Sequence, residues 1–274
     1  MSLIVLASAS GSPGVTTTAL GLALTWPRPV LLVEADPTGG SSVAAGYLRG
    51  QLVPPEAMLD LAFAQQGGDL LETLARVSIT LPGSRVGFVA GVRSHEQANS
   101  LVPLWEPLAS ALRLLEDTGQ DVIVDAGRLG LAGSPLALLE QADLALLCTR
   151  SDLVGLAGAR SWAATLKDRF ERAGAATNLG LLLVGTGEPF TAREVTTVLD
   201  IPVVATVAWD PAPAAVFSHG APPPRPGIGQ RMAGRSGIDD TSLVRSLRAS
   251  RSAINATIRD TTNQLSVSES GGAS

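Results

Sequence analysis

Short apolar runs alternate with longer segments of helical character along most of the chain. Most of these runs are apolar at consecutive positions, which is typical of strands that are covered on both faces. The predicted strands span residues 3–8, 30–35, 85–91, 121–127, 142–149, 179–185 and 201–207. The predicted helices span residues 15–26, 96–118, 134–141, 152–173 and 191–199. This alternation predicts an α/β fold: a doubly wound, mostly parallel sheet with helices on both faces and ligands at the carboxyl ends of its strands.

The pattern changes after residue 220. Residues 1–220 are predicted to form one α/β domain, and residues 221–240, rich in Pro, Gly and Arg, are predicted to be a linker. Residues 241–262 have helical spacing, and residues 263–274 have the composition of a disordered tail.

The predicted C-terminal helix is basic and amphipathic. Its apolar positions are Leu243, Leu247, Ile254 and Ile258. Its arginines are Arg245, Arg248, Arg251 and Arg259. Because the apolar face lacks Phe and Trp, packing on the domain or on a protein partner is favoured over membrane binding. Nonspecific contact with DNA or a membrane through the arginines stays open.

Composition narrows the class further. The chain has 274 residues, 45% of them apolar but only 4% aromatic, so Leu, Val and Ala must fill the core. A net charge of -5 gives no general attraction to nucleic acid or to an anionic membrane. The single cysteine, Cys148, lies in an apolar run and fits a reducing compartment. With no signal peptide and no apolar stretch of about 20 residues, a cytoplasmic protein is expected.

The stretch LASASGSPGVTTTALGLAL, residues 6–24, has the outline of a phosphate-binding loop. Gly11 and Gly14 supply conformational freedom after an apolar strand, and Thr16 and Thr17 supply hydroxyls at the start of a helix. In such loops, backbone N–H groups and the helix N-terminus surround a phosphate, while a Ser or Thr hydroxyl binds magnesium.

This stretch resembles the deviant Walker A loop of the ParA/MinD family, whose pattern is K-G-G-x-G-K-T-T. The positions that match are Gly11, Gly14, Thr16 and Thr17. Ser10 and Val15 replace the two lysines, Ser12 replaces a glycine, and Pro13 fills the variable position.

Further segments resemble later family motifs in the same order. VLLVEADPTGG, residues 30–40, is similar to the second strand and its acidic segment, with Glu34 and Asp36 as the acids. DVIVDAGRLG, residues 121–130, resembles the Walker B strand and ends near Asp125. PVVATVAWDPAPAAVFSHG resembles the late loop near the nucleotide base and contains Asp210. The resemblance covers about residues 1–220.

The resemblance implies ATP and Mg²⁺ as cofactors. The residues it implies for nucleotide binding are Gly11, Ser12, Gly14, Val15, Thr16, Thr17 and Asp210. It implies Thr16 and Asp125 as magnesium ligands, and Glu34 and Asp36 as the catalytic carboxylates if the protein hydrolyses ATP. It also implies a protein partner and a homodimer.

The missing lysines change the expected activity. Lys167 is the only lysine of the chain and lies within a predicted helix, so no lysine replaces them. Because a charge-assisted hydrogen bond contributes about 1.5–3 kcal/mol, one lost lysine weakens binding by one to two orders of magnitude. Hydrolysis suffers more, since a positive group on the transferring phosphoryl contributes roughly 10³ to 10⁵ in rate. A non-hydrolysing or very weak nucleotide-binding scaffold is therefore expected, a spatial regulator of a positioning, pilus or secretion system. One branch of the family assists tight-adherence pilus assembly.

Two alternatives stay open. The first is an active ATP-switched dimer in which an arginine restores the missing charge; the candidates are Arg28, Arg93, Arg128 and Arg150. The second is an NAD(P)-binding Rossmann protein, because Glu34 follows the glycine turn at the spacing of a ribose-binding acid.

Overall fold

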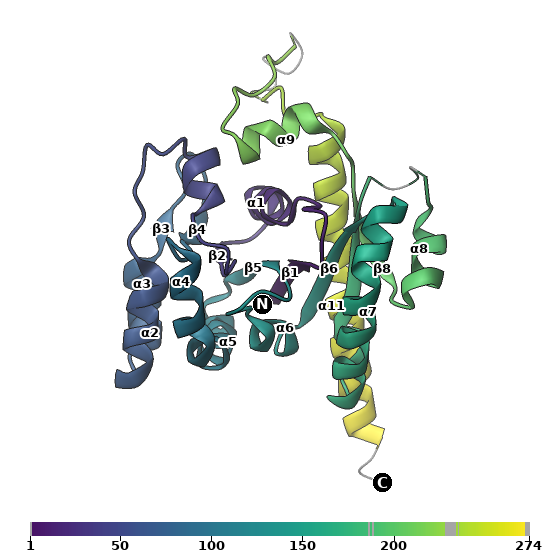
Figure 1. The fold of residues 1–274 in the computed structure, drawn as a ribbon, viewed down its shortest axis with the longest axis horizontal. Helices are drawn as coiled ribbons and strands as arrows, with labels where there is room; N and C mark the ends of the chain where they lie inside the picture. Colours follow the sequence, from purple (N-terminus) through teal and green to yellow (C-terminus); the bar gives the residue numbers. More distant parts are fainter. Residues whose placement is uncertain (1, 186, 188, 228–233, 235, 272–274) are drawn as a thin grey trace.

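The computed structural model describes residues 2–185, 187, 189–227, 234 and 236–271 (Figure 1). Its centre is an eight-stranded sheet in the order β3-β4-β2-β5-β1-β6-β7-β8. The strands are β1 (Leu3–Ser8), β2 (Val30–Glu34), β3 (Ile79–Thr80), β4 (Val86–Val89), β5 (Asp121–Arg128), β6 (Leu144–Arg150), β7 (Leu179–Val184) and β8 (Val203–Val207). Every pairing is parallel except that of β3 with β4. The α/β class and the mostly parallel sheet are therefore as predicted.

All seven predicted strands are present, with ends within two residues of the predicted ones. Strand β3 is the addition. It has only two residues at the sheet edge, too short to give a run of apolar positions.

The helices agree less closely with the prediction. Those foreseen are α1 (Val15–Thr25), α6 (Leu136–Glu140), α7 (Leu153–Arg172) and α8 (Ala192–Leu199). The single helix predicted at 96–118 is divided into α4 (His95–Ala98), η2 (Asn99–Leu104), α5 (Trp105–Leu114) and η3 (Leu115–Thr118). Pro103 lies inside η2 and removes a backbone donor, so a regular helix cannot run through it.

Three α-helices of the described chain were not predicted: α2 (Ala57–Gly67), α3 (Leu70–Val77) and α9 (Pro211–Ser218). In α3, Leu70, Leu74 and Val77 are buried at a spacing that indicates a helix, so the signal was present in the sequence. Helix α9 begins with a proline at its first position, a common helix start, but its run of alanines gives little periodicity.

Each face of the sheet has its own apolar core because side chains alternate along the buried strands. In β1, Leu3 and Val5 face one core, while Ile4 and Leu6 face the other. Helices α1, α9 and α11 (Ser242–Gly271) cover the second face, whereas α2, α3, α5, α6, α7 and α8 cover the first. Figure 1 shows α1 and α9 above the sheet and α5 and α6 below it.

The strand order bears on the dinucleotide-binding alternative. In the Rossmann order 3-2-1-4-5-6, the first two strands of the chain are neighbours. Here β5 lies between β1 and β2 and pairs with both. The Rossmann topology is therefore excluded, although the glycine turn and Glu34 are present.

Helix α11 (Ser242–Gly271) extends beyond residue 262, where the predicted helix ends. It begins at Ser242 and continues to Gly271, because no Pro or Gly interrupts the chain before that residue. Residues 272–274, and residues 228–233 and 235 of the predicted linker at 221–240, lie outside the described residues. No described helix is long and apolar enough to cross a membrane.

The apolar face of α11 packs on the domain. Leu243, Leu247 and Ile254 are buried in the core between α11, α1 and β8. Gly21 of α1 makes room for this contact, since a Cβ at that position would lie 2.6 Å from a methyl carbon of Leu247. This face is consequently covered within the chain, as the preference for domain packing anticipated.

Leu247→Ala should destabilise the protein by about 2–5 kcal/mol, the usual cost of emptying a buried leucine site. The reason is that Leu247 is fully buried against α1. Urea unfolding followed by circular dichroism measures the change. Leu153→Ala is the matched control, since Leu153 is 69% exposed and should change stability by less than about 0.5 kcal/mol. Equal effects of the two variants would contradict the packing of α11.

Candidate functional site

The loop between β1 and α1 has the backbone shape of a phosphate-binding loop. Gly11, Ser12 and Gly14 have φ of 73°, 43° and 97°. Glycine adopts this left-handed region freely, whereas Ser12 does so at a cost of roughly 1–2 kcal/mol. No side chain caps the N-terminus of α1, so its first N–H groups are free to bind an anion.

The two positions that carry lysine in the ParA/MinD pattern are occupied by small or apolar residues. Val15 begins α1, is 7% exposed and belongs to the apolar core on that face of the sheet. Ser10 lies against α7, where a Cβ on Gly158 would be 1.8 Å from its hydroxyl oxygen. Neither position supplies a charge to the loop.

Carboxylates gather at the carboxyl ends of two neighbouring strands. Glu34 ends β2 and pairs in register with Asp125 of β5. Asp36 follows β2 and approaches the end of β5 at Gly127, where a Cβ would lie 2.2 Å from the Asp36 carboxyl carbon. The parallel pairing of β2 with β5 thus brings together the acids that the sequence placed in separate motifs.

Asp125 is the most deeply buried of these acids. It is 1% exposed, and its Oδ1 accepts a hydrogen bond from the N–H of Gly127 at 3.0 Å. Burial raises the pKa of Asp125 to about 7, with a further contribution from the charges of Glu34 and Asp36, while the Thr16 hydroxyl acts in the opposite direction. Its Oδ2 is buried and has no hydrogen-bond partner within the described part of the chain.

This unpartnered oxygen fits a magnesium site. Thr16 and Asp125 would hold the ion, since hydroxyl and carboxylate oxygens are the ligands that Mg²⁺ prefers. Among the described residues, no three His, Cys, Asp or Glu side chains are arranged to hold a metal by themselves. Phosphate oxygens and water would therefore complete the shell, as is usual for Mg²⁺.

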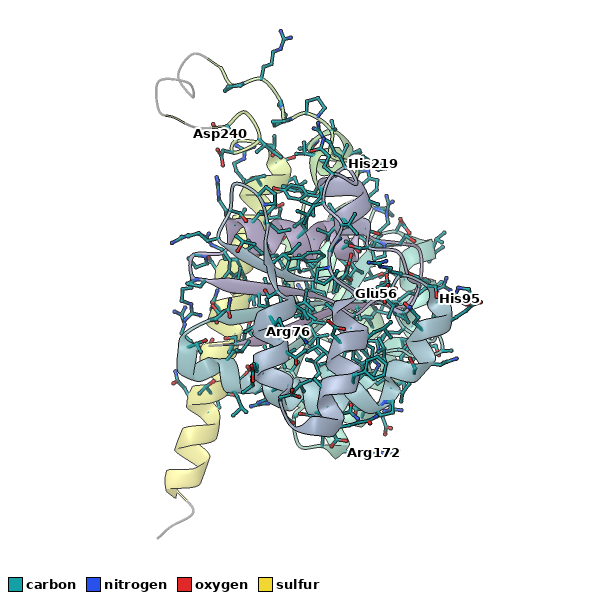
Figure 2. The ribbon with its side chains drawn as sticks, turned by 90° about the vertical axis from the view of Figure 1, so that its left-hand side faces the viewer. Glu56, Arg76, His95, Arg172, His219 and Asp240 are labelled. Atoms are coloured by element: carbon teal, nitrogen blue, oxygen red, sulfur yellow. The ribbon has the colours of Figure 1, made fainter. Side chains whose placement is uncertain are left out.

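A cleft of about 480 Å³ opens above the loop. Most of the predicted site residues line it: Ser12, Gly14, Val15, Thr16, Thr17 and Asp36. Arg128 from the end of β5 and His219 from the end of α9 also line it, together with Phe217 and Ser218. Figure 2 shows His219 in the upper part of the molecule and Arg172 in the lower part, above the last turns of the C-terminal helix.

Of the four candidate arginines, only Arg128 reaches this cleft. Its side chain makes no hydrogen bond or ion pair with any described residue. Arg28 is paired with Asp121 at 2.8 Å and Arg93 with Glu56 at 3.0 Å. The guanidinium of Arg150 lies 3.9 Å from the centre of the Trp209 ring, a cation–π contact outside the cleft.

Two predicted site residues have other contacts. Glu34 is 4% exposed, and its carboxylate accepts hydrogen bonds from the N–H groups of Val43 at 3.3 Å and Gly91 at 3.2 Å. Its burial raises its pKa, an effect that these hydrogen bonds oppose. Asp210 does not line the cleft and accepts a hydrogen bond from the Ser242 hydroxyl of α11.

His219 is the functional candidate that sequence reasoning missed. It is isolated in the sequence, without a neighbouring histidine, cysteine or acid at metal-binding spacing. Only the packing of α9 over the loop brings it to the cleft, where its Nδ1 lies 2.7 Å from the Ser218 hydroxyl oxygen.

The loop geometry and the strand order are those of a P-loop NTPase-like α/β fold. No protein-family model matches the chain, and no curated protein matches its sequence. Solved structures do match it. The cell division ATPase MinD of Pyrococcus furiosus is 18% identical with a TM-score of 0.65, covering 93% of this chain and 99% of that one.

Two further structures are similar over nearly the whole chain. A ParA family ATPase from Chlorobium tepidum is 16% identical with a TM-score of 0.67, covering 92% of this chain and 99% of its own. MinD of Pyrococcus horikoshii, solved with Mg-ADP, is 15% identical with a TM-score of 0.64. The match covers 93% of this chain and 96% of that one. The protein therefore has the fold of the MinD and ParA ATPases.

The buried carboxyl of Asp125 should make the metal-free protein less stable at high pH. The pKa of Asp125 is raised from 3.8 to about 7. The folding stability that this group contributes is therefore fully present below about pH 4 and is lost as the pH rises through 7. At 1.36 kcal/mol per pKa unit, this group should lower the free energy of unfolding of the wild type by up to roughly 4 kcal/mol between pH 4 and pH 8.

Asp125→Asn should flatten this dependence, because the amide keeps an acceptor for Gly127 without a charge. Urea unfolding in EDTA at several pH values measures both proteins. Asp143→Asn, at a half-buried acid distant from the cleft, is the control. Parallel pH profiles for wild type and Asp125→Asn would refute the assignment.

Proposed function

We propose that this protein is a degenerate ParA/MinD-like protein that binds Mg-nucleotide weakly, hydrolyses it little or not at all, and acts as a scaffold or spatial regulator. The burial of Val15 is the observation that supports this proposal most strongly. An apolar side chain packs into the core at the first position of α1, where the family pattern has the lysine that neutralises phosphate.

What is retained supports binding. The free N–H groups at the start of α1, the hydroxyls of Thr16 and Thr17, and the buried Asp125 form the anion-binding and magnesium-binding parts of a nucleotide site. The magnesium ion would supply charge neutralisation between phosphate groups. In this arrangement Thr16 and Asp125 hold and orient the ion, while the loop holds the phosphates.

The absence of the two lysines of the family pattern affects hydrolysis more than binding. Acceleration of phosphoryl transfer depends on positive groups that stabilise charge in the transition state. Among the described residues, Asp36 lines the cleft, and the buried Asp125 and Glu34 lie beside it. The guanidinium of Arg128 and the imidazole of His219 are the basic groups that line it. This balance favours weak ground-state binding over fast cleavage.

The role that we propose is in cell positioning, in pilus assembly or in secretion, exerted through a protein partner and a homodimer in the cytoplasm. Its structural relatives include proteins of cell division and of the ParA family. DNA contact through arginines of α11 is a subsidiary proposal, since Arg245 and Arg259 are on an exposed side of that helix.

An active ATP-switched dimer is the second candidate, and Arg128 is the observation that favours it. Its unpaired guanidinium lines the cleft and would reach toward a bound phosphate. Turnover that exceeds that of Asp125→Ala and falls by at least tenfold in Arg128→Gln would establish this alternative.

Val15→Lys should strengthen Mg-ATP binding by about tenfold to a hundredfold, the value of a restored charge-assisted hydrogen bond. Isothermal titration calorimetry with ATP and Mg²⁺ measures the affinities of wild type and variant, and a coupled assay measures turnover. Wild type should bind weakly, with turnover no higher than that of Asp125→Ala.

Val15→Met is the matched control, because methionine has similar length and no charge. If Val15→Met binds as tightly as Val15→Lys, charge is not what the loop lacks. Absence of any ATP binding in both wild type and Val15→Lys would reject the nucleotide site. Rapid hydrolysis by wild type would reject the proposal of a weak or silent ATPase.

A further inference from the structure

A second cavity lies behind the phosphate-loop helix, away from the loop itself. It has a volume of about 970 Å³, twice that of the cleft and at the upper end of the range of about 300–1,000 Å³ for small-molecule sites. Its boundaries are the end of α1, the π-helical turn η1 (Val43–Tyr47), the β3–β4 turn, α9 and α11. We call it the rear cavity.

The walls of the rear cavity are largely apolar and aromatic. Trp26 and Phe217 are each 6% exposed and line it together with Leu24, Tyr47 and Val244. Burial raises the pKa of the Tyr47 phenol, which therefore stays neutral at physiological pH. Such walls favour the flat apolar body of a ligand.

The charged groups of the rear cavity are unbalanced. Its arginines are Arg49, Arg248 and Arg251, and the acid among its described lining residues is Asp239. Asp239 is already paired with Arg248 at 2.5 Å. Arg251 donates to the carbonyl of Thr25 at the end of α1, and the side chain of Arg49 has no partner among the described residues. Within the described part of the chain, two guanidinium charges of the cavity thus lack a carboxylate, in a protein whose net charge is -5.

The backbone around Arg49 is built to hold that side chain in place. Arg49 has φ of 55°, a left-handed conformation that costs a non-glycine residue energy and that is enriched at ligand clamps. A Cβ on Gly220 would lie 2.5 Å from Cγ of Arg49, and one on Gly46 would lie 2.1 Å from the carbonyl oxygen of Ser218. These two glycines let η1 and the end of α9 meet backbone to backbone, which fixes Arg49 at the rim.

We propose that the rear cavity binds a small amphipathic anion. Its apolar body lies against the wall to which Trp26 and Phe217 contribute, and its acidic group is held by Arg49 and Arg251. This site requires no nucleotide at the phosphate loop, so it is independent of the proposed function. Phe217 lines both cavities, so an occupant of the rear cavity contacts a wall of the cleft.

The probe is 1-anilinonaphthalene-8-sulfonate, an aromatic anion whose fluorescence rises on transfer to an apolar site. The full chain should bind it saturably at one site. Arg49→Gln should weaken binding about tenfold, the effect of one charge-assisted hydrogen bond. The uncharged N-phenyl-1-naphthylamine should bind wild type and Arg49→Gln equally, which a merely structural effect of the substitution would not produce. Val216→Trp, which fills the cavity from α9, should weaken both dyes.

Two controls separate the rear cavity from other surfaces. Arg160→Gln removes an exposed arginine on α7, across the sheet, and should leave both affinities unchanged. Trp209→Ala removes a half-exposed indole outside the cavity and should also have no effect. Circular dichroism confirms that each variant is folded. Binding that is lost in Trp209→Ala, or that is unaffected in both Arg49→Gln and Val216→Trp, overturns the proposal, as does the absence of saturable binding.

Discussion

The burial of Asp125 beneath the first turn of α1 is the constraint on which the site depends. Parallel pairing places the carboxyl ends of β1, β2 and β5 side by side, so the loop after β1 and the acids of β2 and β5 must meet. A carboxylate that is 1% exposed with an unpartnered oxygen destabilises the protein unless it is neutralised. In this position a proton or a metal ion would neutralise it, although the loop itself carries no lysine or arginine.

The residues at the two positions where the family pattern has lysine are both packed against other parts of the domain. Val15 joins the apolar core, and Ser10 fits against Gly158 so closely that no larger residue could stand opposite it. Both positions are therefore integrated into packing. Ser12 has a left-handed backbone at a position where the family pattern has glycine, the residue that adopts this conformation most freely.

Much of the fold could be predicted because buried parallel strands are short, continuous apolar runs with polar ends. The acids at the ends of β2 and β5 were found because they stand in segments that resemble motifs of the ParA/MinD family. Helices α2 and α9 escaped prediction because few of their positions are buried, so tertiary contacts, more than periodicity, determine them. His219 and Arg49 had no sequence signal, since their positions depend on how α9 packs against η1, a contact between segments about 170 residues apart.

That contact also links the two cavities. Gly46 and Gly220 allow η1 and the end of α9 to approach so closely that their backbones touch, and Phe217 of α9 then separates the cleft from the rear cavity. A shift of α9 away from η1 would therefore enlarge both cavities together and carry His219 away from the loop. Asp210, which precedes α9, accepts a hydrogen bond from Ser242 of α11, and α11 also packs on α1. The position of α9 therefore depends on α11. Helix α11 thus contacts both α1 and the start of α9, although none of its described residues lines the cleft.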